Sequence, residues 1–303
     1  MILVEAQQVG FGASGRNSGF AIDLPHDIGA PDYIGDLPTA RMNLKLNLRA
    51  HALLKQLIAE HGIDCQLRPD GKCQAAVSEK GLAVLQAYRS GLDKLGQPYE
   101  MIDERDLPAH FGTSFYRKAL FTPGTFLLQP AALAKGLAES LPGNVTLYEH
   151  TVITHLEQGQ RTVLKHKEGE IVADQLLLTN NAFATHFGFL PGRLLPVFTY
   201  ASMTRPLAET EQARLGGKST WGIIPADPFG STLRRTPDQR LLCATASAST
   251  RMAAPISTVS TAPDASTGRR SSGAFQCYRA CRSSTPGAAP CVFRATTFRT
   301  SAA

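Results

Sequence analysis

A short run of apolar residues near the start of the chain ends in an acid. Ile2, Leu3 and Val4 are followed directly by Glu5. A hydrophobic strand that ends in a carboxylate is typical of the second strand of a dinucleotide-binding fold, where the carboxylate accepts hydrogen bonds from both hydroxyl groups of a ribose. Many strands end in Glu, so this feature alone does not separate a nucleotide site from an ordinary surface acid.

A second segment that could bind a ligand follows shortly after. Residues 12–19 read Gly-Ala-Ser-Gly-Arg-Asn-Ser-Gly. Small side chains let the main chain approach a ligand closely, and successive N–H groups in such a turn can bind a pyrophosphate or face the edge of a flavin. Arg16 adds a positive charge suited to phosphate. Taken alone, the segment is equally compatible with a generic Gly/Ser loop.

The two segments together are much more specific than either one. Leu3-Val4-Glu5-Ala6, then Val9-Gly10, then residues 12–17 and Gly19 closely resemble the D-amino-acid-oxidase/glycine-oxidase (DAO) family of FAD-dependent oxidoreductases, and above all its gamma-glutamylputrescine oxidoreductase branch. In that family the acid binds the adenosine ribose and the small-residue loop lines the FAD. The resemblance implies that FAD is bound by Glu5, Ala6, Gly12, Ser14, Gly15, Arg16, Asn17, Gly19, Val152, Thr179 and Asn180.

Four further stretches extend the resemblance to about residues 1–242. Residues 126–130 match the approach to a helix before the family's central hairpin, and Thr151-Val152 match the position where a valine main chain meets the adenine. Residues 174–182 match a strand that ends in a small-residue turn containing Thr179 and Asn180. Residues 196–207 match the entry strand of the substrate domain.

The resemblance also implies a reaction. Members of the family oxidise an amine or amino acid by moving a hydride from the carbon next to nitrogen to the flavin, so the cofactor supplies the chemistry and the protein positions the substrate. We therefore expect FAD as cofactor and a small-molecule amine or amino acid as substrate, and we nominate no catalytic side chain and no metal site. Asp23 and His26 lie close enough to the loop to face a cationic substrate, although a structural role is favoured for His26.

Hydrophobic spacing predicts an α/β protein with an added antiparallel sheet. Helices are expected over residues 38–60, 79–95, 103–111 and 130–141. Strands are expected over residues 2–4, 74–77, 145–148, 152–156, 162–165, 175–179, 196–204, 220–224 and 232–242, with a turn at 167–170. The fold class is an incomplete FAD-binding Rossmann-like domain with an antiparallel β substrate domain.

We expect three regions along the chain. Residues 1–195 form an FAD-binding domain with a helical insertion, and residues 196–242 begin the β-rich substrate domain. The first strand and Gly-x-Gly-x-x-Gly loop of the family would precede Ile2, so we expect the FAD domain to lack its first βα unit. We therefore expect the polypeptide to hold little or no FAD, and a non-catalytic remnant of the family is the alternative function.

Residues 243–303 have a different composition from the rest of the chain. The body, residues 1–242, has 24 basic and 24 acidic residues, whereas the tail has seven Arg and only Asp264, which accounts for the whole net charge of +6. The tail lacks Leu, Lys and Glu, so we expect it to be disordered or encoded in a shifted reading frame. The positive charge therefore gives no support for nucleic-acid binding.

Other classes of protein are disfavoured. No apolar run approaches the length of a membrane span, and no signal peptide is visible, so we expect a cytoplasmic protein. Six cysteines without a CxxC pair are expected to be reduced thiols. An unrelated nicotinamide-dependent Rossmann protein is disfavoured because residues 12–17 follow Glu5 at the flavoprotein spacing. The sequence does not indicate the oligomeric state.

Overall fold

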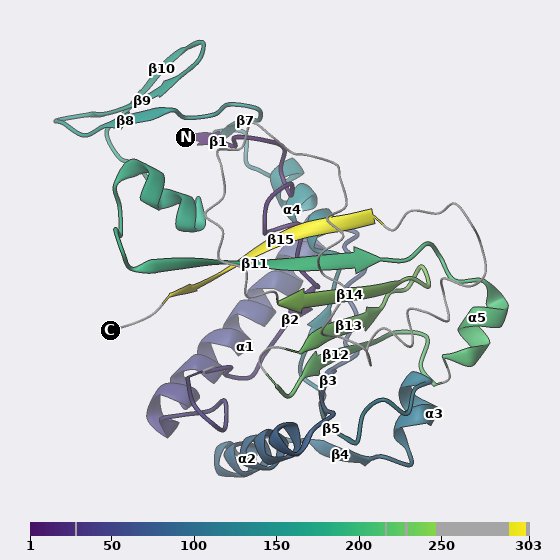
Figure 1. Ribbon diagram of the computed structural model, residues 1–303. Helices are drawn as coiled ribbons and strands as arrows, with labels where there is room; N and C mark the ends of the chain where they lie inside the picture. Colours follow the sequence, from purple (N-terminus) through teal and green to yellow (C-terminus); the bar gives the residue numbers. More distant parts are fainter. Residues whose placement is uncertain (28, 216, 228–229, 247–290, 301–303) are drawn as a thin grey trace, which may run out of the picture.

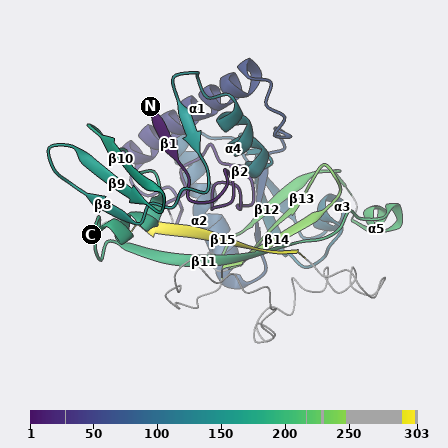
Figure 2. The same ribbon diagram turned by 90° about the horizontal axis from the view of Figure 1, so that it is seen from above.

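The computed structural model describes the chain except residues 28, 216, 228–229, 247–290 and 301–303. It is a mixed α/β structure built around one large sheet, with helices lying beside it (Figure 1). Viewed from above, the small three-stranded sheet projects away from the large one (Figure 2). None of the described helices is both long and apolar enough to cross a membrane.

The large sheet has eight strands in the order β15-β11-β14-β13-β12-β3-β5-β4. They are β3 (Lys72–Ala76), β4 (Glu100–Asp103), β5 (Lys118–Thr122), β11 (Leu194–Met203), β12 (Trp221–Pro225), β13 (Ser231–Arg235), β14 (Leu241–Ala246) and β15 (Cys291–Thr300). All neighbours are antiparallel except β12 and β3, which are parallel and place Ile223 opposite Cys73. Residues 72–122, within the region where we expected the FAD-binding domain, therefore supply three strands to the sheet that contains residues 194–246.

Three smaller sheets complete the β-structure. β1 (Ile2–Val4) pairs in parallel with β7 (Thr146–Tyr148), and β2 (Phe20–Ala21) pairs antiparallel with β6 (Phe126–Leu127). The third sheet is an antiparallel meander of β8 (His155–Glu157), β9 (Thr162–His166) and β10 (Gly169–Ala173). The parallel pair and the antiparallel sheets agree with the predicted fold class.

The long helices begin and end where the sequence provides caps. The helical elements are α1 (Leu37–Glu60), α2 (Glu79–Leu95), α3 (Leu107–Phe111), α4 (Pro130–Glu139), α5 (Glu209–Arg214) and the 3₁₀ helix η1 (Asn181–Phe187). Asp36 accepts a hydrogen bond from the Thr39 N–H at the start of α1, and Ser78 accepts one from the Gly81 N–H at the start of α2. Gly96 ends α2 in the left-handed conformation, which glycine adopts without strain.

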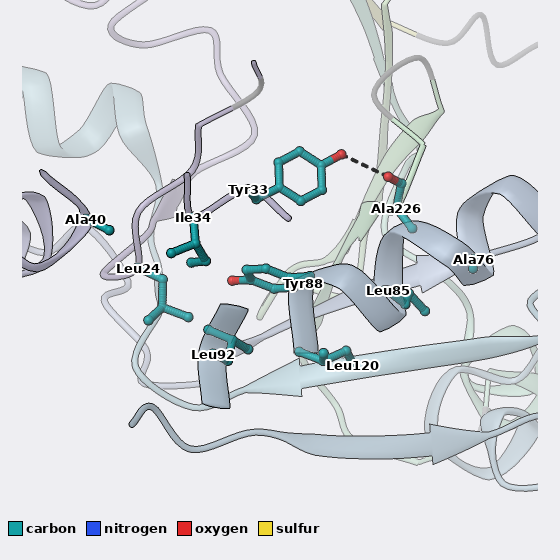
Figure 3. Close-up of a cluster of buried hydrophobic side chains, with 10 residues drawn as sticks. All are labelled: Leu24, Tyr33, Ile34, Ala40, Ala76, Leu85, Tyr88, Leu92, Leu120 and Ala226. Carbon is teal, nitrogen blue, oxygen red and sulfur yellow. Dashed lines mark hydrogen bonds between the residues drawn. The ribbon is translucent and has the colours of Figure 1, made fainter. Parts of the chain in front are cut away.

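One face of the large sheet packs against α2 (Figure 3). Leu85, Tyr88 and Leu92 of the helix meet Leu120 of β5, and all four are almost completely buried. Tyr33 packs edge-on against Tyr88 and donates a hydrogen bond of 2.9 Å to the Ala226 carbonyl. This contact joins the segment before α1 to the end of β12.

The other face packs against α3. Cys73 and Ala75 alternate with Gln74 along β3, so they point to this second face. They form a buried cluster with Trp221 of β12 and with Phe111 of α3, whose ring meets the indole edge-on. The sheet is thus covered on both sides where β3 and β12 meet.

The structure confirms the predicted helices in the 38–60, 79–95 and 130–141 regions, with ends that differ by a few residues. Three other expectations were wrong. The helix expected at 103–111 begins only at Leu107, because β4 continues to Asp103. The strand expected at 152–156 starts instead at His155. The strand expected at 232–242 is two strands, because a tight turn at 236–240 closes through a hydrogen bond from the Thr236 N–H to the Arg240 carbonyl.

The expected strand at 175–179 is not formed. The strand that pairs with β9 is instead β10, which begins at Gly169, directly at the turn predicted for residues 167–170. Residues 174–180 are irregular, and Leu177 is 85% exposed. The apolar composition of this segment suggested a strand, but its main chain has no neighbouring strand to pair with among the described residues.

Two parts of the tail, for which we expected disorder or a shifted reading frame, form strands. Residues 243–246 belong to β14 and pair with β11 and β13, and residues 291–300 form β15 at the edge of the sheet. Alternating β-prone residues can form such strands when a partner strand is present, even where the composition is poor in Leu. Residues 247–290 and 301–303 lie outside the described residues.

Candidate cofactor site

The end of β1 brings Glu5 beside the loop that follows β7. The Glu5 N–H donates to the Tyr148 carbonyl at 2.9 Å, which extends the pairing of the two strands by one residue. The Glu5 carboxylate accepts a hydrogen bond from the Gln7 N–H at 2.9 Å through Oε1. The second carboxylate oxygen is thus left for another donor at the carboxyl end of two parallel strands, the edge where such sheets bind nucleotides.

The segment after β7 lies against the segment after β1. The Thr151 N–H donates to the Glu5 carbonyl at 3.0 Å, and the Glu149 carboxylate accepts the Val9 N–H at 2.6 Å. Val152 follows directly and is about half exposed. The structure therefore brings two of the predicted positions, Glu5 and Val152, to the same edge, although they are far apart in sequence.

The loop at 12–19 folds into a compact turn. The N–H groups of Gly15 and Arg16 both donate to the Gly12 carbonyl, at 3.2 and 3.1 Å. The Asn17 side chain stabilises the turn. Its amide donates to the Ala13 and Ser14 carbonyls, and its Oδ1 accepts a hydrogen bond from the Gly19 N–H. Asn17 thus has a structural part in the loop besides the predicted one.

Gly15 allows the loop to lie against its own beginning. A Cβ atom at this position would lie 2.0 Å from the Gly10 carbonyl oxygen, well inside van der Waals contact. Gly10 in turn packs against Ala131 and Ala134 of α4. Gly15 is therefore required by close approach within the loop's own main chain, whereas the close approach to a ligand expected from the sequence stays a prediction.

Three successive N–H groups at the start of this turn have no partner among the described residues. For Gly12, Ala13 and Ser14, the structure records no hydrogen bond from the main-chain N–H to any described residue. Consecutive unpaired N–H groups on a tight turn form a concave site for an anionic or electron-rich ligand. Arg16 lies beside them with its guanidinium stacked 3.9 Å above the Phe11 ring.

A groove of about 300 Å³ opens next to the loop. Ser14, Asn17 and Gly19 form one side of it, and apolar side chains of α1 and α4 form the other, including Leu54, Leu133 and Leu137. Its lining is mostly apolar with a few polar groups, which is the usual character of a small-molecule site.

Similarity to known proteins decides the family. The pattern that defines the family "DAO: FAD dependent oxidoreductase" matches residues 1–287. The chain belongs to the DAO family. The match reaches well beyond residue 242, where we expected the resemblance to end. It supports a flavoprotein rather than the nicotinamide-dependent Rossmann protein considered as an alternative.

Individual DAO-family relatives are distant in sequence. The chain is 26% identical over 247 residues to gamma-glutamylputrescine oxidoreductase of Escherichia coli, covering 80% of this chain and 58% of that protein. It is 24% identical over 221 residues to the probable oxidoreductase OrdL of Haemophilus influenzae, covering 69% and 51%. The chain thus spans little more than half the length of these relatives.

Solved structures share the fold of this DAO-family chain. Glycine oxidase from Geobacillus kaustophilus superposes with a TM-score of 0.71 at 18% identity, covering 99% of this chain and 76% of that one. L-Amino acid deaminase from Proteus vulgaris gives a TM-score of 0.58 at 16% identity, covering 80% and 54%. At such identities the similarity shows the fold alone.

Several of the groups described above could bind FAD, the cofactor of the DAO family. A carboxylate at a strand end, three unpaired N–H groups and an apolar groove suit a ribose, an anionic or polar group and a flat ring, respectively. Thr179 and Asn180 are different. Asn180 precedes η1 with a buried, unpaired Oδ1, and no hydrogen bond links either residue to the described segments at 5–19.

The other predicted side chains have structural contacts. Asp23 is buried and accepts a hydrogen bond from Thr125 Oγ1 at 3.1 Å, and His26 is exposed and stacks on Tyr33. Neither lines the groove. No cluster of metal-ligating side chains occurs within the described ranges.

One contact of the loop at residues 12–19 was not predicted from the sequence. Arg234 of β13 reaches the loop and donates to the Ser18 carbonyl at 3.1 Å. No motif marks this arginine, and its partner lies more than 200 positions away in the chain, so only the folded sheet reveals the contact.

Proposed function

We propose that this chain forms part of an FAD-dependent oxidoreductase that oxidises the C–N bond of a small amine or amino acid. The observation that carries the proposal is that the segments after β1 and β7 meet and bring Glu5 and Val152 to one edge, with the small-residue loop at 12–19 following Glu5 in a chain of the DAO family. The bound flavin would supply the redox chemistry by accepting a hydride from the carbon next to nitrogen.

The chain's residues would divide the binding of FAD between them. Glu5 would accept hydrogen bonds from ribose hydroxyl groups, with Ala6 and Val152 flanking the adenosine. The N–H groups of residues 12–14 and the charge of Arg16 would face the anionic or electron-rich part of the cofactor. Thr179 and Asn180 belong to this proposal only by family resemblance.

The substrate class follows from the relatives' names. Gamma-glutamylputrescine oxidoreductase acts on an amine, as its name states, and glycine oxidase acts on an amino acid. We propose one of these two classes for this chain, with no nucleic acid involved. We also propose a cytoplasmic location, which agrees with the free, buried thiols of Cys65 and Cys73.

FAD titration tests the proposal directly. Purified protein is titrated with added FAD, and flavin fluorescence and the melting temperature are followed. We expect saturable quenching and a melting temperature that rises with FAD concentration. A panel of amines and amino acids then tests for reduction of the flavin absorbance without oxygen. A chain that shows neither quenching nor a thermal shift would support the non-catalytic alternative.

A further inference from the structure

Arg234 carries a buried positive charge at the boundary between the large sheet and the cofactor loop. Its side chain is 3% exposed, and its Nη1 donates both to the Ser18 carbonyl at 3.1 Å and to the Leu128 carbonyl at 2.5 Å. Arg234 lies on β13, whereas Leu128 lies between β6 and α4. One guanidinium nitrogen therefore links three segments that are distant in sequence.

The loop is shaped to receive this guanidinium. The Leu128 N–H donates to the Gly19 carbonyl at 2.9 Å, which continues the pairing of β2 with β6. Arg234 then donates to the Ser18 and Leu128 carbonyls at the end of this paired segment. A Cβ atom on Gly19 would lie 2.1 Å from Arg234 Nη1 and 2.1 Å from the Leu128 carbonyl oxygen. Gly19 also has a φ of +76°, which only glycine adopts readily.

The partners of Arg234 are main-chain carbonyls rather than a carboxylate. No ion pair joins it to another described residue, and its Nε is buried without a partner. Burial lowers the pKa of the guanidinium, although Asp70 and Asp238 oppose this. A charge buried in this way is tolerated only because its hydrogen bonds are made, so removal of either side leaves polar groups unpaired.

We propose that Arg234 is a positioning residue, which fixes residues 17–19 of the cofactor loop against the large sheet. The proposal deepens the proposed function, because it assigns a residue of the sheet to the geometry of the FAD site. It also predicts a physical link: displacement of β13 would displace the loop.

The test compares two buried arginines that are neighbours on β13. Arg235 is 5% exposed but bonds to Gln239 and to the Lys218 carbonyl, away from the loop. Arg234→Met and Arg235→Met each remove the charge of an arginine with little solvent exposure, and only the first removes a hydrogen bond to the loop. Amide hydrogen exchange of a peptide spanning residues 12–21 is measured without FAD, relative to a peptide from α2 that reports global opening.

We expect exchange in the loop to be at least tenfold faster in Arg234→Met and within twofold of wild type in Arg235→Met. Arg234→Lys, which keeps the charge but has fewer donors, should give an intermediate rate and serves as the main variant if Arg234→Met does not fold. Equal loop exchange in the Arg234 and Arg235 variants would overturn the proposal.

FAD affinity provides the second readout. We expect Arg234→Met to weaken FAD binding about tenfold or more, with Arg235→Met unchanged, and unchanged affinity in Arg234→Met would also count against positioning of the cofactor loop. If no form of the protein binds FAD, the proposed function fails, but the exchange experiment still decides whether Arg234 positions the loop.

Discussion

Lys72 Nζ lies 3.4 Å from the phenolic oxygen of Tyr88, and both side chains are enclosed between β3 and α2. The ammonium group also lies 5.1 Å above the Tyr88 ring. Desolvation lowers the pKa of Lys72 to about 8, and the negative charge of Asp23 only partly opposes this. A lysine is therefore kept inside the protein at a cost in stability.

This burial predicts a pH dependence of the free energy of unfolding. The unfolded chain keeps its proton on Lys72 up to about pH 10.5, whereas the folded protein releases it above about pH 8. The contribution of Lys72 should therefore become more favourable as pH rises from 8 to 10.5, by about 1 kcal/mol per pH unit, and the full penalty applies below pH 8.

Lys72→Met isolates this effect. Cys73 works in the opposite direction above pH 9, because burial raises the pKa of its thiol to about 12, so wild type alone would show a mixed slope. Urea unfolding of both proteins at pH 7, 8, 9 and 10 gives the difference between them. That difference should change with pH only above about 8, and a pH-independent difference would show that Lys72 is not buried as described.

Gly15 and Gly12 form a matched pair in the cofactor loop. A Cβ atom on Gly15 would meet the Gly10 carbonyl at 2.0 Å, whereas one on Gly12 would meet nothing within 4 Å. We expect Gly15→Ala to destabilise the fold by roughly 2 kcal/mol and to weaken FAD binding at least tenfold, because the main chain must move. Gly12→Ala should keep stability within about 0.5 kcal/mol of wild type in urea unfolding. Equal stability losses in the two variants would contradict this view of the loop.

Glu5 is expected to matter for FAD affinity and little for stability. Its carboxylate accepts only one recorded hydrogen bond, from Gln7. Hydrogen bonds to a charged acceptor contribute about 1.5–3 kcal/mol, so Glu5→Gln should weaken FAD binding about tenfold to a hundredfold. Glu149→Gln is the control, because Glu149 holds the neighbouring Val9 N–H and has no predicted contact with the ribose. Similar affinity losses from both changes would argue for a general loosening of this edge.

The buried thiols give a chemical test of the sheet. Cys65 and Cys73 are 1% and 5% exposed, and burial raises the pKa of both thiols, so little thiolate is available. Iodoacetamide at pH 8 followed by peptide mass mapping should label these two positions at least a hundredfold more slowly in native buffer than in urea. Rapid native labelling of Cys73 would show that the face covered by α3 is open.

Local features were predictable from the sequence. The helical spacing of apolar residues, with caps at Asp36 and Ser78 and a stop at Gly96, identified α1 and α2 because these signals lie within a few residues of the element. The sequence also marked residues 12–19 as a turn rich in small residues, because Gly and Ser favour turns locally; their approach to a ligand stays a prediction.

Non-local pairing was not predictable. The edge strand β4 and its neighbour β5 are short and carry no clear alternation, and the place of β3 beside β12 depends on residues 150 positions apart. The run of leucines at 176–178 suggested a strand, yet a strand needs a partner that sequence alone does not reveal. Arg234 is the clearest case, because its role exists only through the carbonyls of Ser18 and Leu128.

The parallel pairing of β12 with β3 also constrains how the molecule is made. During synthesis, β3, β4 and β5 leave the ribosome long before the segment containing Ile223, so the edge of β3 stays unpaired while about 150 more residues are added. Contacts between residues so far apart in sequence slow folding. Until β12 is made, the unpaired edge of β3 can pair with a strand of another chain. We therefore expect the nascent chain to depend on chaperones, and its soluble yield to fall as more copies are synthesised at the same time.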